Sequence, residues 1–433
     1  MKKVLLLVSC ILLFSCVTVF GFTDVDENSE YYEAVNFMYE KGIIGGYGDG
    51  TFRPDNPISY NELAALLTKS SDIYDKYLTV FDLPHPHWAT SYLIFARTQG
   101  FFNVSEILYG KAEECVKPIS KGMALRGMFG MLGLEMYDYR FYELDIADIE
   151  ECESDNVKNA VVLANVLGLI EKDENNELGV SENITRGEVC NILYELLEMK
   201  EKGELKVVAP EIIEDLNIVL DDNISEKGKI HIINELAMMP LDIIKKFNQM
   251  NWALYVTNKD LSDIYDISGD PDLRNAVGLC SYRNKSLYVT YKILLNMTPT
   301  LLHEFGHFAE YAYFNTVSDE SRIKNLYEEE KVKLTDICGR DYCETNDAEF
   351  FAEAFKNYTA YIYYLRLSDR KYEFENFTPE TYKFFTDFFT TIDKGFKEDI
   401  EQLIVVEEET EGDLEVVEGI EENTEAETYE TLA

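Results

Sequence analysis

The amino-acid sequence predicts a multidomain protein that is mainly α-helical in its N-terminal half and α+β in its C-terminal half. Two observations lead to this fold class. A helical unit recurs within residues 22–200, and strand-like alternation of apolar and polar residues begins only beyond residue 207. Of the 433 residues, 46% are hydrophobic and 13% are aromatic, which is a globular composition. We therefore expect separately folded domains, each with its own core.

Acidic residues dominate the charge of the chain. The 81 Asp and Glu residues against 39 Lys and Arg residues give a formal net charge of −42. Binding of a polyphosphate needs clustered lysines and arginines, and the sequence contains no basic stripe. The composition therefore argues against a nucleic-acid partner and suits a soluble protein in an extracellular setting.

Residues 1–21 predict a cleaved secretory signal peptide. Two lysines precede an uncharged apolar run over residues 4–20, and the small Gly21 follows, so that cleavage leaves Phe22 as the mature N-terminus. The alternative is a retained anchor, but this run is short for a bilayer span, which needs about 20 residues. Two cysteines within the segment keep lipidation as a minor alternative. No membrane contact is expected after removal of the signal.

Three copies of one helical unit are predicted, at about residues 22–70, 80–133 and 146–198. Each copy combines an aspartate near its start, an amphipathic helix, a glycine-containing turn and a second helix with an N-cap residue. Equivalent positions keep similar spacings in the three copies: 58 and 66 residues for Asp24, Asp82 and Asp148, and 61 and 65 residues for Ser59, Ser120 and Thr185.

Each unit is a helical hairpin that cannot bury its apolar face alone, so we expect the three to pack about a pseudo-threefold axis. Ser59, Ser120 and Thr185 are predicted to cap the second helix of each unit. Glu62 and Glu188 stand three residues after the first and third of these caps, which is the pattern of a capping box.

The segments FTDV…GIIGGYGDGTFRPDNPIS and ITRGE resemble S-layer homology repeats. A triplet of such repeats anchors secreted proteins of Gram-positive bacteria to a secondary cell-wall polysaccharide. The resemblance implies that Arg186, in ITRGE, binds the anionic sugar, since a guanidinium beside a helix N-terminus suits a carboxylate. Tyr60 and Lys121 occupy this position in the first two copies, and a solvated surface arginine is the alternative for Arg186.

A charged segment at residues 201–206 predicts a linker to an α+β domain at residues 207–400. Alternating residues at 252–257 predict a strand, and residues 276–291 predict a hairpin that turns at Arg283 and Asn284.

The motif HEFGH at residues 303–307 points to a metal site. On a helix, His303 and His307 lie one turn apart on one face, so both imidazoles can bind one Zn²⁺ ion. Glu304 is placed to act as the general base for water activated by the zinc ion. The chain has only five histidines, which makes a chance match improbable.

A carboxylate is expected as the third ligand, because Tyr313 stands where a metzincin has its third histidine. The acids at 328–330 fit a solvated helix face. Glu349 and Glu353 are better candidates, since they share one face of a helix rich in Phe and Ala. Glu349 would bind the metal and Glu353 would accept a histidine hydrogen bond. Exposure of both glutamates is the alternative.

HEFGH and the later YCETNDAEFFAEAF resemble the metalloprotease domain of anthrax toxin lethal factor and the related Pro-Pro endopeptidases, over about residues 205–400. The resemblance implies a zincin-like domain of the gluzincin type. It makes His303, His307 and Glu349 the ligands of one zinc ion and Glu304 the general base. It also makes Tyr342 the donor to the oxyanion and Glu353 the partner of a ligand. Pro-Pro specificity is one family option without independent support here.

Two further features are less specific. Cys338 and Cys343 fit either a short disulfide loop or a pair of free thiols. The tail at 401–433 holds 13 acids and no Lys or Arg, which predicts disorder.

Together these features predict a secreted, extracellular zinc metalloendopeptidase anchored to the cell wall or S-layer, which cuts extended peptides or surface proteins. The strand at 276–281 could pair with such a peptide at a sheet edge. One alternative is a wall-bound adhesin or structural protein whose zincin-like domain no longer cuts. The other is a metal-dependent cell-wall amidase.

Overall fold

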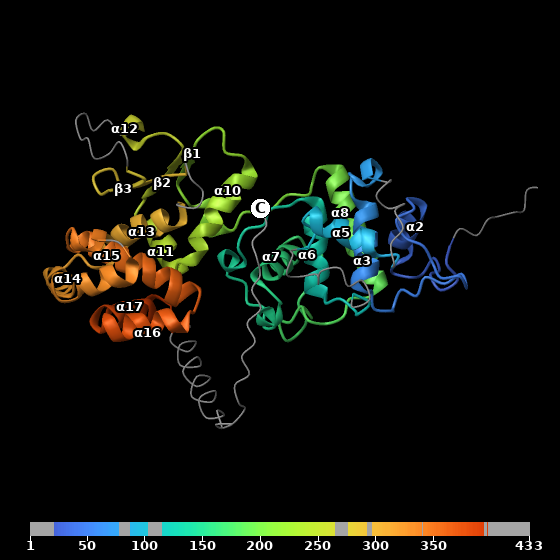
Figure 1. Ribbon diagram of the computed structural model, residues 1–433. Coiled ribbons are helices and arrows are strands. Elements are labelled where there is room, and N and C mark those ends of the chain that lie inside the picture. The colour runs from blue at the N-terminus through green and yellow to red at the C-terminus, as the bar shows by residue number, and fades with distance from the viewer. Residues whose placement is uncertain are drawn as a thin grey trace, which may run out of the picture. The chain divides into compact units, whose positions relative to one another are not determined.

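The computed structural model describes residues 21–77, 87–102, 115–264, 276–291, 297–339, 341–393 and 396. The described part of the chain is mostly helical, with a small mixed sheet (Figure 1). Residue contacts divide the chain into an N-terminal unit, Met1–Ala237 with Asn251–Asn258, and a C-terminal unit, Met238–Met250 with Lys259–Ala433. The predicted signal peptide up to residue 20, Asp82 and the acidic tail lie outside the described residues.

The longer helices of the N-terminal unit follow the predicted order. They are α2 (Tyr32–Glu40), α3 (Tyr60–Ser70), α5 (Thr90–Thr98), α6 (Lys121–Leu132), α7 (Asp155–Val166) and α8 (Arg186–Lys202). Short 3₁₀ turns lie between them: η1 (Tyr74–Tyr77), η2 (Tyr139–Tyr142) and η3 (Ile149–Glu151). One hydrophobic core extends from Val25 to Leu196, so the helical pairs share their apolar faces as expected for units too small to fold alone.

The predicted helix caps are confirmed. The side-chain oxygens of Ser59, Ser120 and Thr185 each accept a hydrogen bond from the main-chain N–H three residues later. The carboxylates of Glu62 and Glu188 in turn accept hydrogen bonds from the main-chain N–H groups of Ser59 and Thr185, which completes the capping boxes of α3 and α8.

A closed ring of main-chain hydrogen bonds joins the residues that precede the three caps. The N–H of Ile58 donates to the carbonyl of Ile184 at 3.0 Å, Ile184 donates to Ile119 at 3.2 Å, and Ile119 donates to Ile58 at 3.0 Å. All three isoleucine side chains are buried. The ring relates these three segments to one another in a threefold manner.

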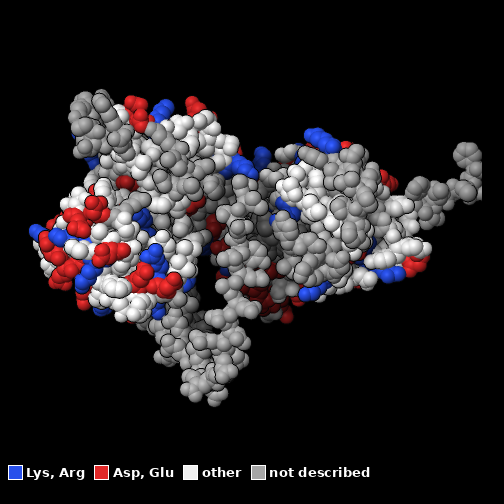
Figure 2. All heavy atoms as spheres, viewed as in Figure 1, with Lys and Arg blue, Asp and Glu red and all other residues white. Residues whose placement is uncertain are grey.

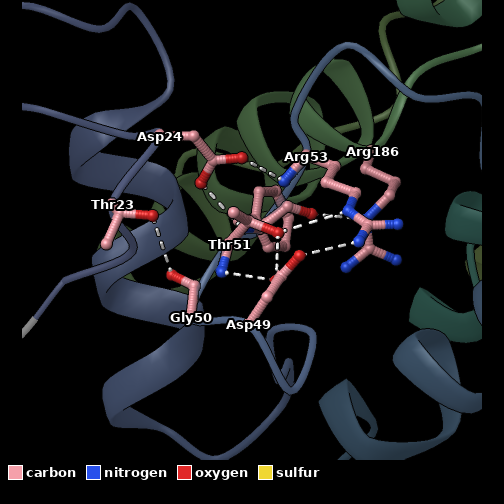
Figure 3. A network of polar contacts seen from close by, with 8 residues as sticks. Thr23, Asp24, Asp49, Gly50, Thr51, Arg53 and Arg186 are labelled. Carbon is pink, nitrogen blue, oxygen red and sulfur yellow. Dashed lines mark hydrogen bonds and ion pairs between the residues drawn. The ribbon is translucent and has the colours of Figure 1, made fainter.

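Asp24 and Asp148 have the same structural role in two of the predicted copies. The Asp24 carboxylate accepts from the N–H groups of Phe52 and Arg53, both at 2.7 Å (Figure 3). The Asp148 carboxylate accepts from the N–H groups of Leu178 and Val180, at 3.0 and 2.9 Å. Each aspartate therefore ties the start of its copy to the turn before the capped helix.

After α8, the N-terminal unit contains strands as well as helices. Helix α8 runs two residues into the predicted linker and ends at Gly203, which adopts a φ of 69°. The elements that follow are α9 (Glu211–Glu214), β1 (Ile218–Leu220), α10 (Glu226–Asn234), η4 (Glu235–Met238) and β2 (Ala253–Thr257). Strand β2 matches the predicted strand and pairs in parallel with β1, with Leu254 opposite Ile218.

The C-terminal unit combines a hairpin with a set of helices. Its elements are α11 (Leu241–Gln249), α12 (Leu261–Ile264), β3 (Gly278–Ser281), β4 (Ser286–Thr290), α13 (Met297–Tyr313), α14 (Val317–Cys338), η7 (Asp341–Glu344), α15 (Asp347–Asn357), the π-helix η8 (Tyr358–Tyr364), α16 (Ser368–Phe377) and α17 (Pro379–Ile392). The predicted hairpin is confirmed: β3 and β4 are antiparallel, with Gly278 opposite Val289. Strand β3 lies at an edge of the sheet.

Aromatic side chains fill the core between α15 and α17. Phe351 and Phe355 of α15 lie with their ring centroids 5.2 and 6.3 Å from that of Phe385 on α17. Tyr358, directly after α15, stacks on the same ring at 5.6 Å. This packing holds one face of α15 in place and leaves the opposite face for other contacts.

The prediction that all three acids at 328–330 are solvated is wrong for Glu330. Glu328 and Glu329 are exposed, but Glu330 is buried, and its carboxylate accepts from the N–H groups of Glu380 and Thr381 at 3.2 and 2.9 Å. These groups begin α17, where the first N–H groups of the helix lack partners within it. Glu330 therefore caps a helix that is distant in sequence.

Lysines and arginines are scattered among the acidic side chains on the described surface in view, without a continuous basic stripe (Figure 2). Within the described ranges, none of the helices combines the length and the apolar character that a membrane span requires.

We predict that Asp148→Ala destabilises the N-terminal unit. The change leaves two buried N–H groups without an acceptor, which costs roughly 2–4 kcal/mol. Urea unfolding of the full chain, followed by circular dichroism, measures the loss. Glu174→Ala, at an exposed site in the same copy, is the control and should stay within about 0.5 kcal/mol of the parent. Equal stability of the two variants would contradict the structural role of Asp148.

Candidate active site

The residues of the candidate site come mainly from two helices that cross closely. Helix α13 carries His303, Glu304 and His307, and α15 carries Glu349 and Glu353. The crossing point is Gly306, which lies between the histidines in sequence. A Cβ atom on Gly306 would approach the Cα of Ala352 to 2.8 Å and its carbonyl oxygen to 3.1 Å. A glycine is therefore needed for the two helices to approach this closely.

Three donor atoms from these helices converge. The Nε2 of His303 lies 3.1 Å from the Oε2 of Glu349, and the Nε2 of His307 lies 3.4 Å from the same oxygen. The two imidazole rings are nearly perpendicular, with centroids 4.9 Å apart. One atom from each of the three side chains lies within 4.8 Å of the other two. The structure thus brings together the three residues that the sequence analysis named as metal ligands.

This donor set fits a zinc ion. Two imidazole nitrogens and one carboxylate oxygen are common zinc ligands, and three protein ligands leave a coordination position open. Burial alone would lower the pKa of His303, but the carboxylates of Glu349 and Glu353 outweigh burial and raise it to about 9. Burial would raise the pKa of Glu349, but hydrogen bonds from both histidines lower it to about 2. The cluster thus favours a positive charge at its centre, either protons or a cation.

Glu353 orients one of these histidines. Its Oε1 lies 2.9 Å from the Nδ1 of His303, and its side chain is only 4% exposed. A carboxylate at this position accepts the Nδ1–H bond and leaves Nε2 free as an acceptor that can bind a cation. The other oxygen, Oε2, accepts from Lys356 at 2.5 Å. The alternative that both glutamates are exposed is wrong, since their side chains are only 20% and 4% exposed.

Glu304 is buried beside the donor cluster. Its burial raises the pKa of its carboxyl to about 7, against the lowering effect of His303 and His307. Strand β3 lies against this carboxylate. A Cβ atom added to Gly278 would collide with Glu304, so only a glycine allows the strand to come this close. The edge strand and the carboxylate thus face the same space.

A cavity of about 700 Å³ opens at this place. Residues 276–278, His303, Glu304 and Tyr342 of η7 are among the residues that line it. The ring of Tyr342 lies 5.7 Å from that of His303, between centroids, and its side chain is about half exposed. Burial and then Glu349 raise the pKa of Tyr342 to about 12, so its phenol stays protonated and can donate a hydrogen bond.

Cys338 and Cys343 flank the turn that carries Tyr342. Their sulfur atoms lie within 4.8 Å of one another and of a Glu353 oxygen, and both residues are free cysteines in the structure. The structure therefore agrees with the alternative of a pair of free thiols.

Arg186 lies in the N-terminal unit. It is not the solvated surface arginine of the alternative, because its side chain is largely buried and hydrogen-bonded. Its side chain is 11% exposed, and its guanidinium donates to the carbonyl of Phe52 and to the Glu62 carboxylate, each at 3.0 Å. The neighbouring loop holds its own Asp49–Arg53 ion pair at 2.9 Å (Figure 3). Arg186 nevertheless lines a cavity of about 140 Å³, together with Lys69 and Trp88 among others.

Sequence reasoning missed Gly278, Gly306 and Lys356. Gly306 offered a signal, since an isolated glycine inside a helical pattern often marks close packing. Lys356 stands three residues after Glu353, a spacing that allows a contact on one helix face. Gly278 offered none, because its neighbour Glu304 is distant in sequence.

We predict that Gly306→Ala lowers the stability of the protein by about 1–3 kcal/mol and weakens zinc binding, because the added methyl group forces α13 and α15 apart. The direction of the change in stability is informative, since alanine normally stabilises a helix interior by about 0.5–1 kcal/mol relative to glycine. Thermal unfolding and competition with a zinc chelator measure the two effects. Gly228→Ala in α10 is the matched control, and an equally stable Gly306→Ala variant would show that the crossing tolerates a methyl group.

Comparisons with known proteins agree with both halves of the sequence interpretation. Residues 21–64 match the S-layer homology domain family, and residues 201–388 match the family described as anthrax toxin lethal factor, N- and C-terminal domain. A search of curated proteins finds no match. Among solved structures, the Pro-Pro endopeptidase PPEP-2 from Paenibacillus alvei is similar, with 16% identity, a TM-score of 0.33, and coverage of 41% of this chain and 100% of that chain. This chain therefore combines an S-layer homology domain, which indicates attachment to the cell surface, with an anthrax toxin lethal factor-like domain of the metalloprotease class.

Proposed function

We propose that the protein is a secreted zinc metalloendopeptidase of the gluzincin type, anchored to the cell wall. The observation that carries this proposal is the convergence of His303, His307 and Glu349 on one point, with the Glu304 carboxylate beside it and an open cavity in front. The anthrax toxin lethal factor-like domain supports the same chemistry.

His303, His307 and Glu349 would hold the zinc ion. When bound, the ion would supply Lewis acidity that polarises the scissile carbonyl and acidifies water. Glu304 takes the proton of the attacking water and later delivers it to the leaving amine. Its buried position suits this task, because burial moves the pKa of its carboxyl towards neutrality, where a group can both accept and return a proton. No residue forms a covalent bond to the substrate.

Tyr342 is proposed to stabilise the oxyanion that develops on the scissile carbonyl. Its phenol lines the same cavity as Glu304 and stays protonated at neutral pH. A hydrogen bond made only in the transition state raises the rate without tightening substrate binding. Glu353 holds His303 in the tautomer that presents Nε2.

The substrate is proposed to be an extended peptide that pairs with the outer edge of β3. Thr290 donates to the carbonyl of Val277 at 2.8 Å, which sets the register of the hairpin. Since main-chain groups alternate in direction along a strand, those of Gly278 and Cys280 face away from β4. Gly278 also lines the cavity beside Glu304, so the main-chain groups that face away from β4 lie near the proposed base. Pro-Pro specificity remains an option for the residues of that peptide.

The N-terminal unit is proposed to hold three S-layer homology repeats, at about residues 22–70, 80–133 and 146–198, that bind a secondary cell-wall polysaccharide of a Gram-positive bacterium. The main-chain ring through Ile58, Ile119 and Ile184 supports three equivalent copies. The cavity beside Arg186 offers a guanidinium for an anionic sugar, with the Lys69 side chain nearby. The predicted signal peptide would deliver the protein to the wall.

We predict that Glu304→Gln abolishes peptide cleavage and retains one equivalent of zinc, because an amide cannot accept the proton of water but keeps the shape of the carboxylate. The parent and the variant are each incubated with a diverse peptide library and zinc, and the products are identified by mass spectrometry. Chelation of the metal should stop the parent as well. Cuts made by the parent alone establish the activity and its sequence preference.

Other outcomes of this experiment separate the alternatives. Zinc bound at one equivalent without cuts by either protein would favour a non-catalytic wall protein. Release of soluble fragments from purified peptidoglycan by the parent would indicate a cell-wall amidase.

We predict that Arg186→Ala reduces the fraction of protein that sediments with purified cell walls several-fold, since the cavity loses its guanidinium. Arg140→Ala is the matched control, because Arg140 also pairs with a carboxylate but does not line the cavity. Thermal unfolding of both variants shows whether either change acts through stability. Unchanged sedimentation of Arg186→Ala would remove this residue from the binding site.

A further inference from the structure

Lys356 is a largely buried lysine that the proposed reaction does not use. It lies on α15, one turn after Glu353, and its side chain is only 12% exposed. Lysines are seldom buried to this degree unless they are paired. Its Nζ donates to the Oε2 of Glu353 at 2.5 Å, and Lys356 also lines the cavity beside Tyr342.

The Glu353 carboxylate is engaged at both of its oxygens. Oε1 lies 2.9 Å from the Nδ1 of His303, and Oε2 accepts from Lys356. The side chain of Glu353 is 4% exposed, so water contributes little to holding it. A buried carboxylate that lost one of two partners would turn towards other donors or towards solvent, and either movement would release the imidazole.

We propose that Lys356 is a positioning residue for the metal centre. It fixes Glu353 in the orientation that holds His303, so that Nε2 of His303 points at the place shared with His307 and Glu349. The order of contacts is Lys356, Glu353, His303 and then the metal. This inference rests on the proposed function, because it takes His303 to be a metal ligand.

A second role for the same carboxylate competes with this one. Oxygen and sulfur atoms of Glu353, Cys338 and Cys343 also lie within 4.8 Å of one another, which is a geometry that could hold a second ion. The Lys356 ammonium already supplies a positive charge at Glu353 Oε2. We therefore expect one zinc ion per chain, and two equivalents bound by the parent would overturn the assignment of Lys356.

The test is a double-mutant cycle in the full chain, read out as zinc affinity. Lys356→Met keeps the aliphatic stem and removes the charge, and Glu353→Gln removes the charged acceptor. Each single change should weaken zinc binding about tenfold, as is typical for groups that orient a ligand. The zinc dissociation constant of the double variant should be at most about twofold larger than the larger of the two single-variant constants. The reason is that both changes break the same chain of contacts. Competition with a chromophoric chelator measures all four dissociation constants.

Two further variants separate positioning from a general structural effect. Lys356→Arg keeps a donor for Glu353 and should restore zinc affinity to within about threefold of the parent. Lys383→Met removes an exposed lysine that pairs with Asp387 on α17, and it should leave zinc affinity unchanged. With Co²⁺ in place of zinc, Lys356→Met should alter the visible absorption bands of the ion, while Lys383→Met should not. Loss of stability without a spectral change would mean a structural role only and would overturn the proposal.

The outcomes distinguish this inference from the proposed function. Parental affinity in Lys356→Met, or losses that multiply in the double variant, would contradict the positioning role and leave the zinc site intact. Failure of the parent itself to bind zinc would instead sink the proposed function.

Discussion

The close crossing of α13 and α15 is the constraint on which the candidate active site depends. Each helix places its functional side chains one turn apart, so each fixes spacing along its own axis only. Contact between Gly306 and the main chain of Ala352 sets the distance between the axes, and with it the distance from the histidines to Glu349. On an adjacent face of α15, Phe351 and Phe355 pack against Phe385 of α17, which resists movement of α15 away from this contact. Two sets of contacts therefore hold α15 in place.

In the N-terminal unit, main-chain hydrogen bonds rather than a close helix crossing hold the segments together. The hydrogen bonds that join its three segments run between main-chain groups of Ile58, Ile119 and Ile184, so the frame does not depend on the polar side chains beside it. The position that follows each cap therefore carries Tyr60, Lys121 or Arg186 without loss of the frame. A scaffold of this kind can change the side chain at one of these positions independently of the other two, which explains how the three segments can carry a single arginine among them.

Features encoded by local spacing were predictable from the sequence. Capping boxes depend on residues three apart, the hairpin on alternation around a turn, and the histidine pair on one helical turn. The buried role of Glu330 was not predictable, because its partners at the start of α17 are about 50 residues away and no local pattern marks them. Arg186 illustrates the same limit, since its contact with Glu62 bridges 124 residues. Spacing along a helix predicts which side chains share a face, but it does not predict which distant segment packs against that face.

The buried site needs two positive charges for balance, which either two protons or one dication can supply. Glu304, Glu349 and Glu353 bring three carboxylates to the space around His303, and among the described residues Lys356 supplies an ammonium that pairs with Glu353. Imidazoles that bind a metal are neutral, so the ionised set carries two negative charges in excess, and burying uncompensated charge is costly. Protons balance this excess only by occupying Glu304 or the histidines, which removes the base or the ligands. A bound dication would balance it and leave every group in the state that the proposed hydrolysis needs.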